Sequence, residues 1–167
     1  MRSWILLIRH GSAGSRRKWE GPDHLRPLDK KGRRQADGLG RALEQTLGLP
    51  ADQIDLILSS PFVRCVETVD PLARSIGRQV GPDVRLAEGH QEIAAELFWS
   101  QVRRDRSDHA SSTVLCTHGD VVPALLDEVA ASGADLGPVP KWPKGSVWAV
   151  EIREGSVAQA RYVTPVV

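Results

Sequence analysis

Residues 4–11 read Trp-Ile-Leu-Leu-Ile-Arg-His-Gly, which is five apolar residues followed by an arginine, a histidine and a glycine. A short run that is apolar at every position is typical of a strand buried on both faces of a parallel sheet. Arg9 and His10 come where such a strand leaves the core. We therefore expect the sheet to be built around residues 4–9, with polar chemistry at the carboxyl end of this strand.

The rest of the chain alternates between strand-like and helix-like patterns. Asp29 is a good N-cap, and apolar residues recur on one face of the segment that runs from it to Gly48. Pro71 lies inside a second helical segment, which it is expected to kink or split. Strands are expected at 54–59, 84–86 and 113–117, helices at 29–48, 60–77, 91–106 and from 120 onward, and hairpin strands at 147–152 and 157–163. This order predicts an α/β fold, a three-layer α/β/α sandwich with a mainly parallel sheet and a C-terminal antiparallel hairpin.

The length and composition are those of an ordinary globular chain. Of the 167 residues, 41% are hydrophobic and 26% charged, so the chain is expected to fold as one domain over residues 1–167. The longest apolar run, residues 4–8, is shorter than a membrane span or a signal-peptide core requires. A soluble, cytoplasmic protein is therefore expected. Cys65 and Cys116 form no C-x-x-C motif, which favours two buried thiols.

Basic residues are concentrated near the amino terminus. Residues 1–41 hold eleven of the 22 lysines and arginines but four of the 21 acids, which favours an anionic ligand. Three of these basic residues are assigned instead to the solvated face of a helix: Arg33, Arg34 and Arg41.

A polar loop over residues 12–28 follows the first strand, and we expect it to close over a substrate. The basic and aromatic residues of this loop are Arg16, Arg17, Lys18 and Trp19. Nucleic acid would explain such a mixture, but one loop is a small platform and the net charge is only +1. We therefore expect no nucleic-acid partner.

In α/β folds, ligands bind beyond the carboxyl ends of the parallel strands. At these ends the sequence places Arg9 and His10 after the first strand, Arg64 in the helix after the second, and His118 after a later one. Two guanidinium groups match the oxygens of a phosphoryl group bidentately. A histidine beside them has its cationic form disfavoured, so His10 is the candidate nucleophile, with one ring nitrogen held by a backbone carbonyl or an equivalent acceptor.

Three further residues complete the expected phosphate site. His118 is expected to stabilise charge on the transferring group, and Gly11 and Gly119 to let the backbone approach the ligand closely. The helix that begins at Asp120 is expected to direct its first N–H groups at the anion.

The sequence favours neither a metal nor a nucleotide cofactor. No two of the five histidines have helical i, i+3 or i+4 spacing, and neither G-x-x-x-x-G-K-[ST] nor G-x-G-x-x-G is present. The other three histidines, His24, His90 and His109, lie in polar stretches and are expected at the surface.

These residues resemble the motifs of the histidine phosphatase superfamily, also called the phosphoglycerate mutase-like family. The matching segments are Leu7–Gly11, Arg26–Asp29 with Gly32 and Gln35–Ala36, Ser59–Pro61 with Arg64–Cys65 and Glu67–Thr68, and Thr117–Gly119. Within this superfamily, the sequence is most similar to SixA-type phosphohistidine phosphatases. The similarity lies in the small size, the Arg-Pro-Leu segment at 26–28 and the ending Lys144–Trp148. They are also similar to the phosphatase-like domain of some actinobacterial MutT-type nudix hydrolases.

The resemblance implies a role for each matching residue. His10 would be phosphorylated during turnover, and Arg9, Arg64 and His118 would complete the phosphate pocket. The proton donor of the family is usually a glutamate after the third strand, a position that Glu88 fits better than Glu92.

The expected function is that of a metal-independent phosphatase without a cofactor. The first and preferred candidate substrate is phosphohistidine on a protein partner, which the resemblance favours. A second is a small phosphoester such as a nucleotide or sugar phosphate, which Glu88 favours because an alkoxide leaving group needs a general acid. A third hypothesis is a non-catalytic module that binds a phosphorylated partner, although intact His10 and His118 argue against it. The partner is thus a phosphorylated protein or a small phosphate ester, and no membrane is expected.

Overall fold

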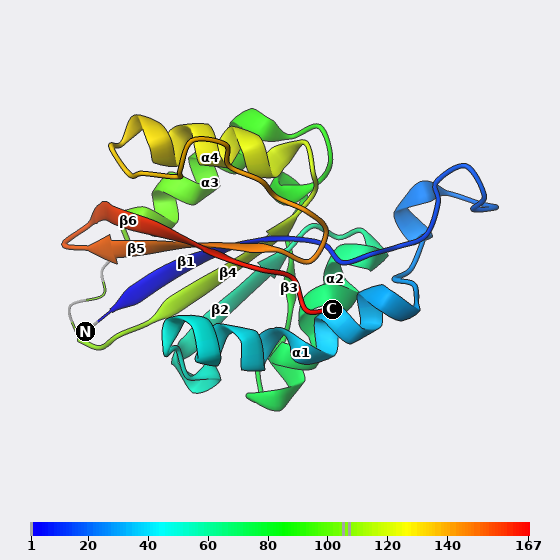
Figure 1. The fold of residues 1–167 in the computed structure, drawn as a ribbon, viewed down its shortest axis with the longest axis horizontal. Helices are drawn as coiled ribbons and strands as arrows, with labels where there is room; N and C mark the ends of the chain where they lie inside the picture. Colours follow the sequence, from blue (N-terminus) through cyan, green and yellow to red (C-terminus); the bar gives the residue numbers. More distant parts are fainter. Residues whose placement is uncertain (1, 105, 107) are drawn as a thin grey trace.

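The computed structural model describes residues 2–104, 106 and 108–167 and contains one six-stranded sheet in the order β3-β2-β4-β1-β5-β6 (Figure 1). The first four strands in this order are parallel to one another, and β5 and β6 are antiparallel to their neighbours. The strands are β1 (Ser3–Arg9), β2 (Ile54–Ser59), β3 (Gly81–Pro82), β4 (Ser112–Thr117), β5 (Val147–Arg153) and β6 (Ser156–Val163). The predicted mainly parallel sheet with a C-terminal hairpin is confirmed.

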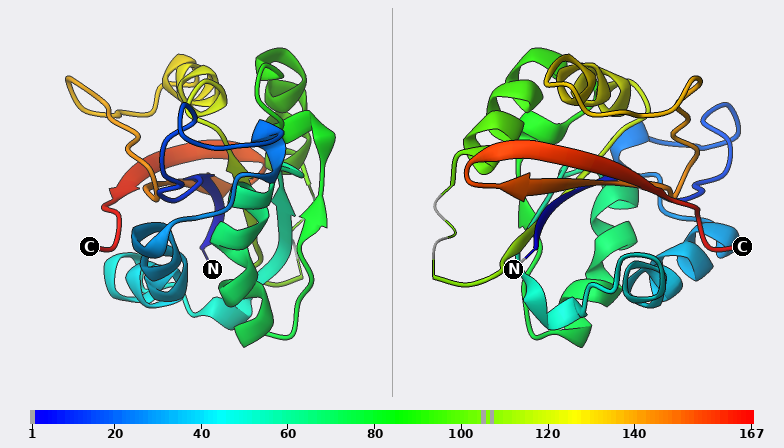
Figure 2. Two further views of the ribbon diagram at one scale, coloured as in Figure 1. Left: turned by 90° about the vertical axis from the view of Figure 1, so that its right-hand side faces the viewer. Right: turned by 60° about the vertical axis from the view of Figure 1, so that its left-hand side comes forward.

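Two pairs of helices cover the two faces of this sheet (Figures 1 and 2). The helices are α1 (Lys30–Leu47), α2 (Val63–Ser75), α3 (Gln91–Val102) and α4 (Val121–Ala131), with short 3-10 helices η1 (Asp23–Leu25), η2 (Ala51–Gln53) and η3 (Val84–Leu86). The first two helices pack on one face and the last two on the other, as the predicted three-layer sandwich requires.

The central strand β1 explains why the run at residues 4–8 is apolar throughout. Trp4, Leu6 and Ile8 lie in the core beneath α1 and α2, whereas Ile5 and Leu7 lie in the core beneath α3 and α4. Both faces of the strand are therefore buried. Because β1 pairs with β4 on one side and β5 on the other, Arg9 and His10 leave the middle of the sheet.

The ends of α1 follow the predicted capping chemistry. The Asp29 side chain accepts a hydrogen bond from the N–H of Gly32 at 2.8 Å, and Gly48 ends the helix in the left-handed region with φ 65°. Arg33, Arg34 and Arg41 are exposed on its outer face, as predicted. The three histidines expected at the surface are also exposed, and the two cysteines are free and buried.

The expected strand at 84–86 is wrong, since these residues form η3. Asp83 accepts a hydrogen bond from the N–H of Arg85 at 3.0 Å, which caps a turn at the point where an extended strand was expected. The third strand is instead the two-residue β3 just before it.

Helix boundaries also differ from the expectation. The second helix begins at Val63, after Phe62 as its N-cap, and continues through Pro71 without being split. The third ends at Val102; residue 105, part of the helix expected at 91–106, lies outside the described residues. Within the described part of the chain, no helix is long and apolar enough to cross a bilayer.

Candidate active site

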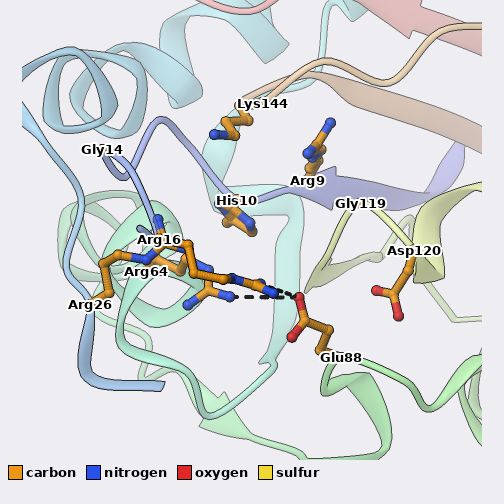
Figure 3. A pocket seen from close by; sticks show the side chains of 10 residues that line it. All are labelled: Arg9, His10, Gly14, Arg16, Arg26, Arg64, Glu88, Gly119, Asp120 and Lys144. Carbon is orange, nitrogen blue, oxygen red and sulfur yellow. Dashed lines mark hydrogen bonds and ion pairs between the residues drawn. The ribbon is translucent and has the colours of Figure 1, made fainter. Parts of the chain in front are cut away.

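A pocket of about 440 Å³ opens beyond the carboxyl ends of β1, β2 and β4 (Figure 3). Its lining is dominated by charged side chains. The lining residues are Arg9, His10, Gly14, Arg16, Arg26, Arg64, Glu88, Gly119, Asp120 and Lys144. The structure thus brings residues from five separate segments to the sheet edge where the sequence predicted a ligand.

His10 is buried at the base of this pocket, and its ring orientation is fixed. Its Nδ1 lies 2.8 Å from the carbonyl oxygen of Gly11. A carbonyl oxygen only accepts, so Nδ1 carries the proton and Nε2 keeps its lone pair. Burial is the largest cause that lowers the pKa of His10, and together with the neighbouring cationic groups it brings that pKa to about 3. The imidazole is therefore neutral at pH 7, as a nucleophile must be.

The lowered pKa of His10 predicts a loss of stability in mild acid. In the unfolded chain the imidazole takes up a proton below its ordinary pKa of about 6.5, whereas in the folded protein it stays neutral down to about 3. The unfolded state therefore binds more protons in this window, and the free energy of unfolding falls as the pH is lowered from 6.5 toward 3. Compared with a His10→Gln variant, the wild type is expected to lose up to about 1.4 kcal/mol more per pH unit there. Urea unfolding of both proteins at pH 7, 6 and 5 measures this difference, and parallel curves would contradict it.

His118 lies beside His10, with ring centroids 5.5 Å apart. Its Nε2 is 2.8 Å from the hydroxyl of Ser60, whose oxygen also accepts from the N–H of Phe62 at 3.3 Å. Its Nδ1 is buried and has no partner among the described residues. With a proton on this nitrogen, the ring would offer an oxyanion of the ligand an otherwise unused donor.

Arg9 stands on the side of the pocket formed by the loop before β5. Its Nη1 donates to the carbonyl oxygen of Trp142 at 3.0 Å, and its buried Nε has no partner among the described residues. Burial lowers the pKa of Arg9. A cation that is partly desolvated and has unfilled donors favours a bound anion.

Arg64 lies in the first turn of α2 and is 1% exposed. Its Nη1 donates to the carbonyl oxygen of Asp23 at 2.9 Å, and its Nη2 lies 3.0 Å from the carboxylate of the same residue. The guanidinium also lies 5.0 Å from the ring centroid of Phe62. These contacts fix the orientation of the Arg64 guanidinium group, while its buried Nε has no partner among the described residues.

Glu88 lines the opposite side of the pocket from Lys144 (Figure 3). Its carboxylate accepts a hydrogen bond from Nη2 of Arg16 at 2.8 Å and lies 3.8 Å from Nη2 of Arg64. The predicted proton donor and one predicted loop residue therefore meet in front of His10. Glu92, the less favoured acid, is exposed and outside this lining.

The predicted substrate loop divides between two hollows. Arg16 enters the main pocket, whereas Lys18 and Trp19 line a neighbouring hollow of about 270 Å³ that shares Gly14 and Arg26 with it. Arg17 is exposed.

The two glycines lie where an added side chain would collide with neighbouring residues of the protein. A Cβ on Gly119 would lie 2.7 Å from the guanidinium of Arg9, and one on Gly11 would lie 3.0 Å from Oε1 of Gln35. Gly119 therefore makes room for Arg9, and Gly11 makes room for α1. The side chain of Asp120, which precedes α4, accepts from the N–H of Gly89 at 2.7 Å and does not cap its helix.

Sequence reasoning missed four pocket or support residues: Asp23, Arg26, Asp120 as a lining side chain, and Lys144. Arg26 lies in a segment that resembles the family, but that segment alone indicates no function for its side chain. In the structure its Nε donates to Asp23 at 3.0 Å and its Nη1 to the carbonyl oxygen of Ala13 at 2.6 Å. Among residues 2–104, 106 and 108–167, no three His, Cys, Asp or Glu side chains are grouped to hold a metal ion.

Arg9, Arg64 and His10 line one pocket at the parallel sheet edge, and His118 lies beside His10, an arrangement suited to binding a phosphoryl group. Comparison with known proteins agrees, because the family model of the histidine phosphatase superfamily, branch 1, matches residues 5–109. The chain belongs to the histidine phosphatase superfamily.

Solved structures share the whole fold. A structure named for the phosphohistidine phosphatase SixA of Nakamurella multipartitia has a TM-score of 0.75 and 23% identity, covering 100% of this chain and 98% of that one. The protein histidine phosphatase SixA complexed with tungstate has a TM-score of 0.72 and 17% identity, covering 97% of both chains.

A curated relative, an 8-oxo-(d)GTP phosphatase of Mycolicibacterium smegmatis, is 30% identical over 162 residues. The match covers 96% of this chain and 48% of the relative, so the chain spans about half the length of that protein.

Proposed function

We propose that the protein hydrolyses phosphate monoesters through a phosphohistidine on His10, without a metal ion. The observation that carries this proposal is the neutral, buried imidazole of His10 with a free Nε2, set among Arg9, Arg64 and His118. A non-catalytic binding module would need the arginines but not a histidine held in the nucleophilic tautomer.

The reaction has two steps. Nε2 of His10 forms a bond to phosphorus while the bond from phosphorus to the leaving oxygen breaks, and Glu88 gives a proton to that oxygen. Water then attacks phosphorus, the nitrogen–phosphorus bond breaks, and the Glu88 carboxylate takes the proton of the water. The two guanidinium groups and Nδ1–H of His118 stabilise the charge on the transferring oxygens in both steps.

A small phosphoester, such as a nucleotide, is the substrate class that the pocket favours. Glu88 lies in the pocket lining, where a basic alkoxide leaving group would need its proton. The name of the mycobacterial relative, an 8-oxo-(d)GTP phosphatase, supports the same class.

Replacing Glu88 by glutamine tests its role as proton donor. We expect hydrolysis of an alkyl phosphate to slow by about 10² or more and that of 4-nitrophenyl phosphate to slow far less, because nitrophenolate leaves without a proton. The ratio of the two kcat/KM values is the readout. Glu92→Gln is the matched control, since Glu92 is exposed and outside the pocket. Equal slowing of both substrates would remove Glu88 from this role.

Phosphohistidine on a protein partner is the second candidate, which the whole-length fold likeness to SixA proteins favours. An imidazole leaving group asks less of a general acid than an alkoxide does. A panel with a phosphohistidine peptide and small phosphoesters separates the two candidates by kcat/KM. A phosphohistidine peptide that remains the best substrate of Glu88→Gln would favour the protein partner.

A further inference from the structure

The pocket lining contains two acids, Glu88 and Asp120, and they differ in their partners. The carboxylate of Glu88 lies 2.8 Å from Nη2 of Arg16. Asp120 has no cationic side chain within 4.0 Å among the described residues. Asp120 therefore adds a negative charge to the pocket lining that no close ion pair compensates.

One oxygen of the Asp120 carboxylate is used by the protein and the other is not. Its Oδ2 accepts hydrogen bonds from the N–H of Gly89 at 2.7 Å and from Nε2 of Gln91 at 3.2 Å, which fix the orientation of the side chain. Its Oδ1 is buried and has no partner among the described residues. A buried acceptor without a donor is costly, and a hydroxyl group of a ligand would remove that cost.

Asp120 lies on the side of His10 where the leaving group would depart. Gly89, which donates to Asp120, directly follows Glu88 in the chain. Figure 3 shows Glu88 and Asp120 on the side of His10 away from Lys144. In the proposed mechanism Glu88 gives its proton to the leaving oxygen. The atoms attached to that oxygen therefore come close to Asp120.

The charges of the pocket favour different groups at the two ends of a substrate. The guanidinium groups of Arg9 and Arg64 match the oxygens of one phosphoryl group. A leaving group with a second phosphate or a carboxylate would lie beside Glu88 and Asp120, where like charges repel. A neutral leaving group with a hydroxyl avoids this repulsion and supplies the donor that Oδ1 of Asp120 lacks.

We propose that Asp120 selects the leaving group of the substrate. It accepts a hydrogen bond from a hydroxyl near the esterified oxygen and repels a second anion. The substrate class is then the monophosphate of a neutral, hydroxylated alcohol, such as a sugar or a nucleoside, rather than a diphosphate. This inference rests on the proposed function, because it assumes a phosphoryl group on Arg9 and Arg64 and a leaving oxygen at Glu88.

Asp120→Asn tests the inference, since asparagine keeps an oxygen for the N–H of Gly89 and puts a neutral amide in place of Oδ1. The substitution is made in His10→Gln, so that the ligands bind without being hydrolysed, and calorimetry gives their dissociation constants. The probes are glycerol 1-phosphate, propyl phosphate, which lacks both hydroxyls, and phosphoglycolate, which has a carboxylate.

We expect His10→Gln to bind glycerol 1-phosphate about tenfold tighter than propyl phosphate, because the hydroxyl reaches a charged acceptor. With Asp120→Asn added, this ratio is expected to fall to within about threefold, and phosphoglycolate is expected to bind about threefold tighter or more. Asp127→Asn is the matched control, because Asp127 is exposed in the helix that Asp120 precedes. In this control we expect all three constants to stay within about twofold.

Three outcomes would overturn the proposal. Equal weakening of glycerol 1-phosphate and propyl phosphate by Asp120→Asn would mean that Asp120 supports the pocket as a whole. No change in either would mean that it does not touch the leaving group. Tighter phosphoglycolate binding with an unchanged ratio would leave repulsion as its only effect and remove the hydroxyl contact. Because binding is measured without turnover, failure of His10 to act as nucleophile would leave this test intact.

Discussion

His10→Gln is expected to lower kcat for 4-nitrophenyl phosphate by about 10⁴ or more. Loss of a nucleophile removes the covalent route entirely, and comparable substitutions in other enzymes have effects of this size or larger. Glutamine keeps a similar volume and a polar end, so we expect the fold to survive. Steady-state kinetics, with the unfolding transition of each protein as a check, measure the effect.

His90→Gln is the control for this substitution. His90 is exposed and its Nδ1 lies 2.7 Å from the carbonyl oxygen of Val84, an arrangement similar to that of His10 but outside the main pocket. We expect its kcat to stay within about twofold of the wild type. A His10→Gln protein that retained a tenth of the wild-type kcat would contradict the assignment of the nucleophile.

Arg64→Ala is expected to lower kcat/KM by about 10³, and Arg64→Lys by about 10². Removing one preorganised donor from a transition-state site costs about 10² to 10³, and lysine restores the charge without the bidentate fork. Alanine also removes one of the arginine partners of the Asp23 carboxylate, which keeps Arg26 and Arg16. The kcat/KM for 4-nitrophenyl phosphate and the dissociation constant of phosphate are the measurements.

Arg74→Ala is the matched control, because Arg74 lies in the same helix with its side chain 73% exposed and pairs with Asp70. If Arg64→Ala had the same kcat/KM as Arg74→Ala, the phosphate would bind elsewhere.

The sequence predicted the parts of this protein that depend on local patterns. The apolar run at residues 4–8 identified the central strand, because only a strand between two helical layers needs apolar residues on both faces. From the strand ends, the topology rule for α/β folds then predicted that Arg9, His10, Arg64 and His118 lie together. His10 and His118 are indeed adjacent, and both arginines line the pocket.

The other features of the fold and the site depend on tertiary contacts, which no local sequence pattern shows. Arg26 and Lys144 lie in irregular segments, and only the folded chain places both beside His10. The apolar residues at 84 and 86 favour a strand. The turn that forms there depends on the hydrogen bond from the N–H of Arg85 to Asp83, which the apolar pattern does not show. No sequence pattern shows that the guanidinium of Arg9 fills the space beside Gly119.

The covalent intermediate is the central claim, and rapid quenching of the enzyme with a radiolabelled phosphate ester tests it most directly. We predict an acid-labile, base-stable label within the first turnover, mapped by peptide analysis to His10 and lost in His10→Gln. A label on another residue, or full turnover with no labelled protein at any time, would contradict the proposed mechanism.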